Sequence, residues 1–467
     1  MIRRSSPASL TRRDFLKLGG GVLGAMAGSN LVARALLQPE KAHAATASRA
    51  PARSVAPATN AQTTAPSLHL VATDGWISLP PEAVVFPYHP DDMAPEPFTT
   101  YIFGFRDVTS VSANGDLVAA QKMKAQLTAP LFWIEQEADY TLRLSNLGLR
   151  LRPDLVDAHT VHFHGFRNAI PVFDGEPHSS VGVPIKRDLT YFYRPHHPGT
   201  YMYHCHFEEI EHVHMGMIGP CFVTPIQNYG RTTPGGPEVV TPARLGGNTD
   251  PGAPRGYCYN DGDGSTAYDR EFVLVLSEIW AESHWCDSHI QLPEWSDYKP
   301  DFYLINGRAY PDTLLPNGAG TDPATGDLMP PPGHPELQYQ PTSSLIQANA
   351  GDRVLLRIIN LGYEEHAMRL DGIKMRVVGK DASLLRGRDG ADLTYLTNTV
   401  VIGPGESVDA IFVAPPHTGT AGYDRFLFYN RNYHRLSNGG HTGYGGQMTE
   451  VRVFPAGALP AQTAPNT

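Results

Sequence analysis

The sequence lacks the features that mark nucleic-acid-binding and membrane-spanning proteins. Charged residues make up only 18% of it, the formal net charge is −10, and no basic block follows the first 45 residues. We therefore expect no nucleic-acid partner. The apolar run at residues 18–37 is interrupted by glycine, serine, asparagine and arginine. Such a run is not hydrophobic enough to form a membrane-spanning helix, so we expect no stable membrane span.

The first 45 residues have the pattern of an export signal. The run TRRDFLK at 11–17 resembles a twin-arginine signal, and Ala42, His43 and Ala44 form a small-residue cleavage pattern. We interpret 1–45 as a twin-arginine-type signal peptide that sends the protein to the periplasm or outside the cell. An N-terminal amphipathic helix that stays attached is the alternative. Residues 46–66, rich in Ala, Thr, Ser and Pro, are predicted to be a disordered linker.

Sustained helical periodicity is also scarce. From about residue 68 onward, short and often alternating apolar runs are broken by Gly, Pro, Asn and Asp, and the chain contains 45 Gly and 41 Pro. Such runs occur at 131–134, 140–145, 272–276, 354–359 and 408–413. This pattern predicts an all-β chain of the sandwich type.

Two parts of the chain resemble each other. LRLSNLG at 142–148 leads to His159, and LRIINLG at 356–362 leads to His366. A recurring order of similar segments indicates duplicated domains. Later in each part, a Gly-Thr turn precedes a tyrosine-bearing strand, which reads YHCH at 203–206 and YNRN at 429–432. The boundaries that we predict are domain one at 67–227, a connector at 228–267, domain two at 268–455 and a tail at 456–467.

Cysteine is rare, with only four in the chain. In an oxidising compartment Cys258 and Cys286 could form a disulfide, which would leave Cys221 as a buried free thiol. Pairing cannot be deduced from sequence alone, and His284, Cys286 and His289 could instead form a small metal site. We prefer the disulfide with surface histidines.

The most informative stretch is YHCHFEEIEHVHMGM at 203–217. Cys205 lies between His204 and His206 on an expected strand, so its sulfur faces one side and the two imidazoles face the other. His212 follows seven residues after the cysteine, and Met217 follows five residues later. A thiolate, an imidazole and a thioether are soft ligands that suit copper in an electron-transfer site.

A further imidazole for that site is expected from HTVHFHG at 159–165. The alternative is a buried core cysteine with incidental histidines on a loop. That alternative requires two chance clusters among only 20 histidines. We therefore favour the metal site.

These motifs carry a family resemblance. Domain one, with His159-x-x-His162-x-His164-Gly165 and His204-Cys205-His206, resembles a cupredoxin domain of the multicopper oxidases, specifically of the two-domain kind with the blue copper in the first domain. The resemblance covers nearly the whole mature chain, strongly in domain one and partially in domain two. It implies two tandem cupredoxin-like Greek-key β-sandwich domains.

The resemblance also implies two sets of copper ligands. The type 1 blue copper would be bound by His159, Cys205, His212 and axial Met217, with Met215 as an alternative axial ligand. The other four imidazoles would form half of a trinuclear cluster, where the family reduces oxygen to water. These imidazoles belong to His162, His164, His204 and His206.

Domain two departs from the family pattern. Arg369 and Asp371 stand where two cluster histidines belong, and the Asn-Arg-Asn run at 430–432 stands where a His-x-His pair belongs. Arginine has no accessible neutral form and is a poor ligand. The second site is therefore expected to hold copper of type 2 or type 3 character, with its nuclearity left open. His366, His434 or His441 could complete it; alternatively, Arg369, Asp371 and Arg431 form a salt-bridged core.

The implied function is that of a periplasmic copper-dependent oxidoreductase. A type 1 copper would take single electrons from a small-molecule or redox-protein donor and pass them through His-Cys-His to the second site, with dioxygen as acceptor. One alternative is a blue-copper electron-transfer or copper-handling protein without oxidase activity. Another is a nitrite-reductase-like enzyme, although His162 stands at the position of that enzyme's catalytic aspartate. Two-domain relatives complete the cluster between subunits, which implies a homotrimer.

Several carboxylates lie close to these motifs in the sequence. They are Asp157, Glu208, Glu209 and Glu211. One of them could relay protons to oxygen. The alternative is that they are solvated loop charges or hydrogen-bond partners of ligating histidines.

Overall fold

The computed structural model describes residues 66–167, 169–229 and 255–467. The predicted signal peptide, nearly all of the predicted linker and much of the predicted connector lie outside the described residues. Strands dominate the described part of the chain, and its helices are short. None of the described helices is long and apolar enough to cross a membrane.

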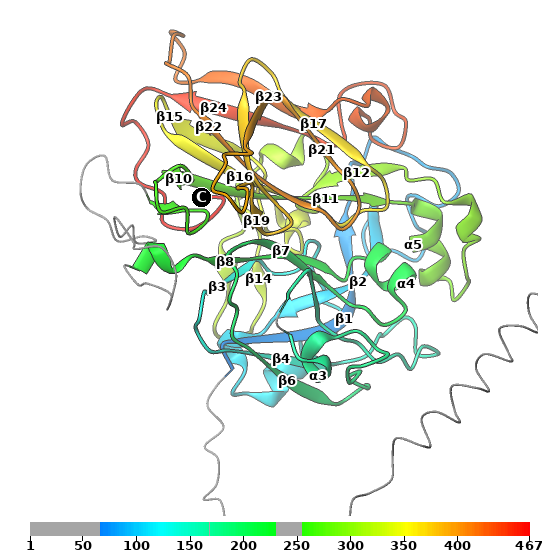
Figure 1. The fold of residues 1–467 in the computed structure, drawn as a ribbon. Coiled ribbons are helices and arrows are strands. Elements are labelled where there is room, and N and C mark those ends of the chain that lie inside the picture. The colour runs from blue at the N-terminus through cyan, green and yellow to red at the C-terminus, as the bar shows by residue number, and fades with distance from the viewer. Residues whose placement is uncertain (1–65, 168, 230–254) are drawn as a thin grey trace, which may run out of the picture. The chain divides into compact units, whose positions relative to one another are not determined.

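The first half of the fold is a pair of four-stranded sheets (Figure 1). One has the order β2 (Thr99–Asp107), β1 (Leu68–Ser78), β4 (Tyr140–Asn146) and β6 (Asp188–Tyr193). The other has the order β3 (Phe132–Glu135), β8 (Ile218–Thr224), β7 (Gly199–His204) and β5 (His162–His164). Leu144 and Tyr191 of the first sheet and Phe163 and Tyr203 of the second share one buried core. The two sheets therefore form a sandwich.

The second half is again a pair of sheets, and each of them has more strands than the sheets of the first half (Figure 1). The path of the seven-stranded sheet is β12 (Phe302–Ile305), β11 (Arg270–Ile279), β16 (Arg353–Asn360), β22 (Ser407–Val413), β18 (Met375–Lys380) and β19 (Ser383–Leu384), and β20 (Tyr395–Thr397) pairs with β18. The five-stranded sheet runs β15 (Ile346–Asn349), β24 (Met448–Phe454), β23 (Asp424–Asn430), β17 (His366–Leu370) and β21 (Thr399–Ile402). Parallel pairing of β1 with β4 recurs as β11 with β16.

The repeated Asn-Leu-Gly segments have the same local structure in both halves. The Asn146 carboxamide oxygen accepts the Gly148 N–H at 2.8 Å, and the Asn360 oxygen accepts the Gly362 N–H at 2.9 Å. The amide nitrogen of each asparagine donates to a main-chain carbonyl of a neighbouring segment. Each asparagine thus ends its strand and directs the chain toward the histidine-bearing strand that follows. The fold is the predicted all-β arrangement of two cupredoxin-like sandwiches.

The two sandwiches meet through β7 on one side and β16 and β22 on the other. The Thr200 hydroxyl donates to Asp409 Oδ1 at 2.5 Å, and Arg357 Nη1 donates to the Thr200 hydroxyl at 3.0 Å. Arg357 also forms a fully buried ion pair with Glu271 at 3.1 Å. Because every charge in this contact has a partner, the buried polar groups hold the halves together in one arrangement.

All four cysteines are free and buried. The expected disulfide between Cys258 and Cys286 is therefore wrong. Cys258 packs against Tyr259 and Tyr268 and accepts a hydrogen bond from Arg357 at 3.5 Å, whereas Cys286 lies on α5 (Ala281–Ser288). The separation of these two environments was not visible in the sequence.

Candidate metal centre

Three predicted ligands meet inside the first sandwich. Cys205 directly follows β7, His159 pairs with Val183, and His212 lies on α4 (Glu209–His214). The Cys205 sulfur is 3.3 Å from His212 Nδ1 and 3.8 Å from His159 Nδ1. All three side chains are buried. With Met217 they are called the first ligand set below.

Main-chain hydrogen bonds hold the segment that carries Met215 and Met217 against Cys205. The Cys205 N–H donates to the Met217 carbonyl at 3.1 Å, and the Met217 N–H donates to the His212 carbonyl at 2.9 Å. The Met215 sulfur instead accepts from the Ser283 hydroxyl of α5 at 4.0 Å. This contact occupies the Met215 sulfur, and Met217 stays the predicted axial ligand.

The electrostatics of the first ligand set suit a cation. Burial alone would raise the pKa of the Cys205 thiol, but the His212 and His159 imidazoles lower it well below its ordinary value. Burial would lower the pKa of His212, but the Cys205 thiolate and the Asp157 carboxylate raise it to about 10. The Thr160 N–H also points at the sulfur, at 3.5 Å. A thiolate between two imidazoles, with the main chain of a methionine hydrogen-bonded to the cysteine, is a donor set that fits copper.

The other four predicted histidines also gather, and they are called the histidine cluster below. Antiparallel pairing of β5 with β7 places His162 opposite His204. The His162 ring centroid is 4.9 Å from that of His206, 5.3 Å from that of His204 and 6.0 Å from that of His164. Imidazole nitrogens of His162, His164 and His204 lie within 4.8 Å of one another. The alternation predicted for the strand therefore separates these rings from the Cys205 sulfur.

Hydrogen bonds orient the rings of the histidine cluster. His162 Nδ1 donates to the Asp174 carbonyl at 2.7 Å, and His204 Nδ1 donates to the Cys205 carbonyl at 2.9 Å. Each ring therefore presents its Nε2 atom as a possible ligand. Burial lowers the pKa of His204 to about 3, so this imidazole is neutral at ordinary pH. Neutral imidazoles that share one space fit a metal site.

The second sandwich adds no histidine to the cluster among the described residues. Fully buried His366 donates from Nε2 to Glu278 Oε1 at 2.6 Å, while its Nδ1 accepts from Asn430 at 3.0 Å and Arg435 at 2.9 Å. Both ring nitrogens are thus used in protein contacts. His434 and His441 are exposed and belong to no potential metal-binding group in the described part of the chain.

The predicted salt-bridged core in domain two is only partly present. Arg369 pairs with Asp371 at 2.5 Å, and the Tyr429 hydroxyl donates to Asp371 at 3.1 Å. This pair is at the surface, however, and Arg431 is exposed. The prediction failed because Arg369 and Asp371 reach the solvent, where water solvates their charges. The pair therefore does not require Arg431 as a further partner.

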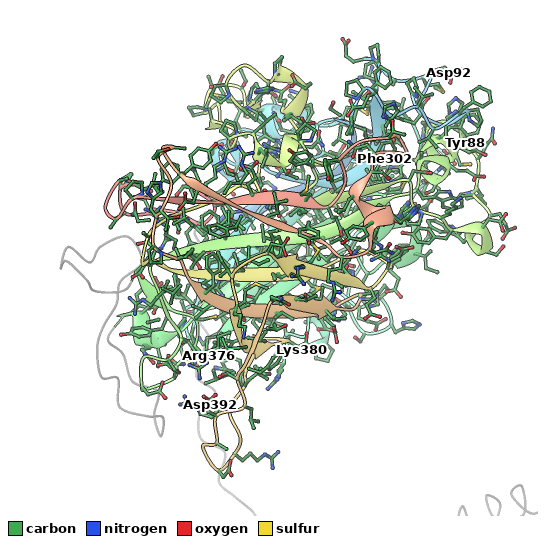
Figure 2. All side chains as sticks on the ribbon, turned by 90° about the horizontal axis from the view of Figure 1, so that it is seen from above. Tyr88, Asp92, Phe302, Arg376, Lys380 and Asp392 are labelled. Carbon is green, nitrogen blue, oxygen red and sulfur yellow. The ribbon has the colours of Figure 1, made fainter. Side chains whose placement is uncertain are left out.

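Sequence reasoning missed Glu278 and wrongly placed His284 at the surface, because His284 is buried. Glu278 is a carboxylate in the wholly buried strand β11, and an acid in an apolar run signals a buried partner. His289 lies with Asp91 and Asp92 rather than with Cys286, and His284 donates to the Tyr101 carbonyl at 2.6 Å. The small metal site of His284, Cys286 and His289, which was the alternative to the disulfide, is therefore not formed among the described residues. Asp92 is exposed and Tyr88 is partly exposed, and Figure 2 labels both near one edge of the molecule.

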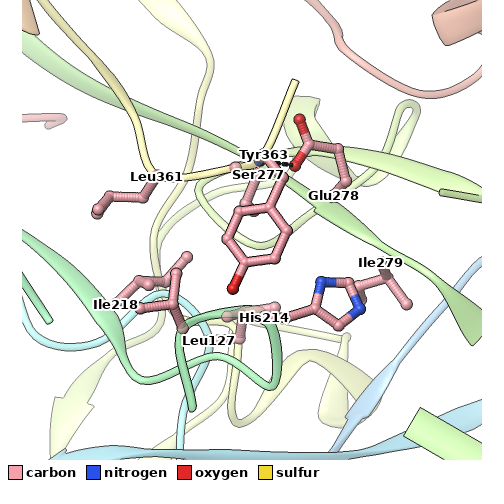
Figure 3. Close-up of a pocket in the computed structure, with 10 residues that line it drawn as sticks. Leu127, His214, Ile218, Ser277, Glu278, Ile279, Leu361 and Tyr363 are labelled. Carbon is pink, nitrogen blue, oxygen red and sulfur yellow. Dashed lines mark hydrogen bonds between the residues drawn. The ribbon is translucent and has the colours of Figure 1, made fainter. Parts of the chain in front are cut away.

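A small cavity lies between helix α4, which carries His212, and the second sandwich. Figure 3 shows Tyr363 beside His214 and Glu278 in this cavity. The Tyr363 hydroxyl donates to the Ile210 carbonyl at 2.5 Å, and the Trp280 N–H donates to His214 Nε2 at 3.4 Å. The second sandwich thus holds the helix that carries His212.

Comparison with curated proteins finds plant laccases. Laccase-15 of Oryza sativa subsp. japonica is 31% identical over 150 residues, and Laccase-5 of Arabidopsis thaliana is 28% identical over 151 residues. Each match covers 32% of this chain. It spans only 20% of the first laccase and 22% of the second.

Two solved structures share the fold. The blue copper oxidase from Nitrosomonas europaea is 21% identical with a TM-score of 0.50, and the match covers 82% of this chain and 85% of that one. The multicopper oxidase mgLAC is 18% identical with a TM-score of 0.52, and the match covers 84% and 87%.

Two family models described as multicopper oxidase match the chain itself. One covers residues 126–228, which contain every member of the first ligand set and of the histidine cluster, and the other covers residues 270–424 of the second sandwich. Together they account for more than half of the sequence. The chain belongs to the multicopper oxidase family.

Proposed function

We propose that the protein is a copper-dependent oxidoreductase that takes single electrons from a donor and delivers them to dioxygen. The first ligand set would hold a type 1 copper, and the histidine cluster would supply ligands to a second site of type 2 or type 3 character. Bound copper would supply one-electron redox chemistry at the first site and oxygen reduction at the second.

The protein's own residues would position and connect these sites. Cys205, buried with its sulfur between two imidazoles, keeps water from the first ligand set. Its two sequence neighbours, His204 and His206, turn their rings into the histidine cluster, with centroids 5.4 Å apart. The Asp174 and Cys205 carbonyls hold the protons of His162 and His204 at Nδ1 and leave Nε2 free.

The observation that carries the proposal is the position of Cys205. Its sulfur lies in one group of potential ligands, and the histidines bonded to it through single peptide links lie in the other. A continuous covalent path of a few bonds therefore joins the two groups. A site that only stored copper would need no such path.

A cysteine substitution tests the first ligand set. Cys205→Ser should abolish the thiolate-to-copper absorbance expected at roughly 600 nm. Cys221→Ser, at another buried free thiol, is the matched control and should keep the colour. Retention of the blue colour in Cys205→Ser would remove this assignment.

A histidine substitution tests oxygen as the acceptor. His162→Ala removes a member of the histidine cluster without touching the first ligand set, so the blue colour should remain while oxygen consumption stops. Oxygen uptake at the wild-type rate in this variant would contradict the proposed second site.

The second sandwich favours a second candidate, a blue-copper electron carrier without oxidase activity. Asn430 stands at an expected ligand position and donates to His366 instead, so that half lacks cluster ligands among the described residues. Copper content separates the functions: about four ions per chain fit an oxidase, about two fit a nitrite-reductase-like enzyme, and a single ion fits a carrier.

We further propose export by the twin-arginine pathway to the periplasm or outside, and assembly as a homotrimer. The trimer rests on the family resemblance, and the exposed His434 and His441 would be accessible to a neighbouring subunit in it. Cell fractionation with and without Arg12→Lys and Arg13→Lys tests export. Light scattering that gives three times the mass of one chain would support the trimer, whereas a monomer would contradict it.

A further inference from the structure

Two carboxylates and one imidazole meet where the loop 79–98 of the first sandwich contacts the end of α5 in the second. Oxygens of Asp91 and Asp92 and a ring nitrogen of His289 lie within 4.8 Å of one another. His289 Nε2 is 3.0 Å from Asp92 Oδ1 and 3.9 Å from Asp91 Oδ1. These three residues are called the Asp–Asp–His group below. They include no member of the first ligand set or of the histidine cluster.

The His289 ring is held in the way that metal-ligating histidines usually are. Its Nδ1 donates to the Trp285 carbonyl at 2.8 Å, so the proton of the neutral imidazole is at Nδ1 and the lone pair is at Nε2. The Trp285 ring stacks on the imidazole with centroids 4.1 Å apart, which fixes the direction of the ring. The Nε2 lone pair therefore faces two carboxylates. Such an arrangement is repulsive unless a cation lies between them.

Asp91 gives a second, independent indication of a cation. Its side chain is only 2% exposed, and its two hydrogen-bond donors are neutral. The Met93 N–H donates to Oδ1 at 2.8 Å, and the Ser288 hydroxyl donates to Oδ2 at 2.5 Å. Among the described residues its ion-pair partner is His289, at a distance of 3.9 Å that is too long for a hydrogen bond. Buried carboxylates are normally paired with a charge or bound to a metal.

We propose that the Asp–Asp–His group binds one divalent transition-metal ion, Zn²⁺, as a structural clamp between the two sandwiches. One imidazole nitrogen and two carboxylate oxygens are ligands that Zn²⁺ accepts, and the exposed side of Asp92 leaves a coordination position open to water. His289 also directly follows α5, where the negative end of the helix dipole favours a cation. This inference does not depend on the proposed function, because it uses none of the predicted copper ligands.

The ion would fix the C-terminal end of α5 to the first sandwich. The helix already makes two contacts with that sandwich: the Ser283 hydroxyl donates to the Met215 sulfur, and Asp287 pairs with Arg152. A bound ion adds a third contact that requires both sandwiches to be folded. Because the unfolded chain does not hold the three ligands together, binding of the ion stabilises the folded protein.

Binding is tested by titrating Zn²⁺ into the copper-loaded protein in competition with a zinc-responsive dye. Cu²⁺ binds nitrogen and oxygen ligands more tightly than Zn²⁺ does, so the protein is first washed with a weak chelator. The parent should bind one Zn²⁺ per chain at the Asp–Asp–His group. The variants Asp92→Asn and His289→Gln should each weaken this binding by at least about tenfold. Asp92 is exposed, so its substitution leaves the fold intact.

Two matched variants control for the loss of a surface carboxylate or imidazole. Asp116→Asn removes an exposed carboxylate on α2 (Gly115–Ala119). His334→Gln removes an imidazole that contacts the single carboxylate of Glu336 at 2.9 Å and belongs to no group of three potential ligands in the described part of the chain. Both controls should bind Zn²⁺ like the parent.

The clamp is tested by thermal unfolding of the same proteins. Zn²⁺ at about a hundred times its dissociation constant should raise the Tm of the parent and of both controls by at least about 2 °C. It should leave the Tm of Asp92→Asn and His289→Gln unchanged. Absence of Zn²⁺ binding in the parent, or equal affinities in the parent and both variants, would overturn the site and leave His289 as an imidazolium paired with Asp92. Binding without a rise in Tm would overturn the clamp.

Discussion

Glu278 Oε1 holds Nε2 of His366 at 2.6 Å inside the second sandwich. His366 follows its Asn-Leu-Gly segment as His159 follows the equivalent segment in the first sandwich. In the first sandwich the imidazole faces a cysteine sulfur, and in the second it faces a carboxylate. The duplicated position therefore has a buried hydrogen-bonding role in one half and a predicted metal-binding role in the other.

Removal of His366 should destabilise the fold without affecting the copper. His366→Ala would leave the buried Glu278 carboxylate without the hydrogen bond from His366, and an unsatisfied buried charged group costs about 3 kcal/mol. Urea unfolding should show this loss, while the blue absorbance of the copper-loaded protein stays at the wild-type level. Loss of the blue colour in a folded variant would show that His366 contributes to the metal site.

Position 362 requires a glycine because the Glu278 carboxylate leaves no space for a side chain there. A Cβ atom at position 362 would overlap the Glu278 carboxylate, so Gly362→Ala should displace this carboxylate from His366. We expect a loss of about 1 to 3 kcal/mol of unfolding free energy, the usual cost of overpacking a core. Gly351→Ala is not a suitable control because of its positive φ, whereas Gly115→Ala, with open space around its Cβ, is suitable and should be tolerated.

The two methionines of the ligand loop should respond differently to substitution. Met217→Leu removes the expected weak axial donor, so the reduction potential should rise and the visible spectrum should change. Met215→Leu removes only the contact with the Ser283 hydroxyl, and such a volume-conserving swap should cost less than about 1.5 kcal/mol. Spectroelectrochemistry of both variants distinguishes them. A potential that moves only in Met215→Leu would reverse the assignment.

His89 should make stability dependent on pH. Its ring packs against Phe98 and Phe302, and burial lowers its pKa from 6.5 to about 4. Below pH 6.5 the unfolded chain therefore binds a proton that the folded chain excludes, so stability falls between pH 6.5 and about 4.

The variant His89→Leu removes this titration. Between neutral pH and about pH 4, its unfolding free energy should fall by up to about 3 kcal/mol less than that of the wild type. Denaturant titrations at several pH values measure the difference. Parallel curves for the two proteins would show that His89 is protonated in the folded state.

The sequence predicted those features that depend on residues close together in the chain. The asparagine side chains at 146 and 360 bond to an N–H two residues later, so their role follows from the motif itself. The alternation at His204, Cys205 and His206 is likewise a property of a strand. Glu278 and His366 lie 88 residues apart, and nothing in the spacing of either residue indicates the other. The separate environments of Cys258 and Cys286 depend on packing between distant strands in the same way.

The contacts on α4 have a consequence for substitutions that are distant from the predicted ligands. Tyr363 and Trp280 of the second sandwich hold the helix that presents His212, through the Ile210 carbonyl and the His214 ring. Among the described residues the second sandwich adds no histidine to the histidine cluster, yet it fixes the position of the helix that carries His212. Substitutions at Tyr363 or Trp280 would therefore reach the first ligand set indirectly, by shifting the helix that presents His212.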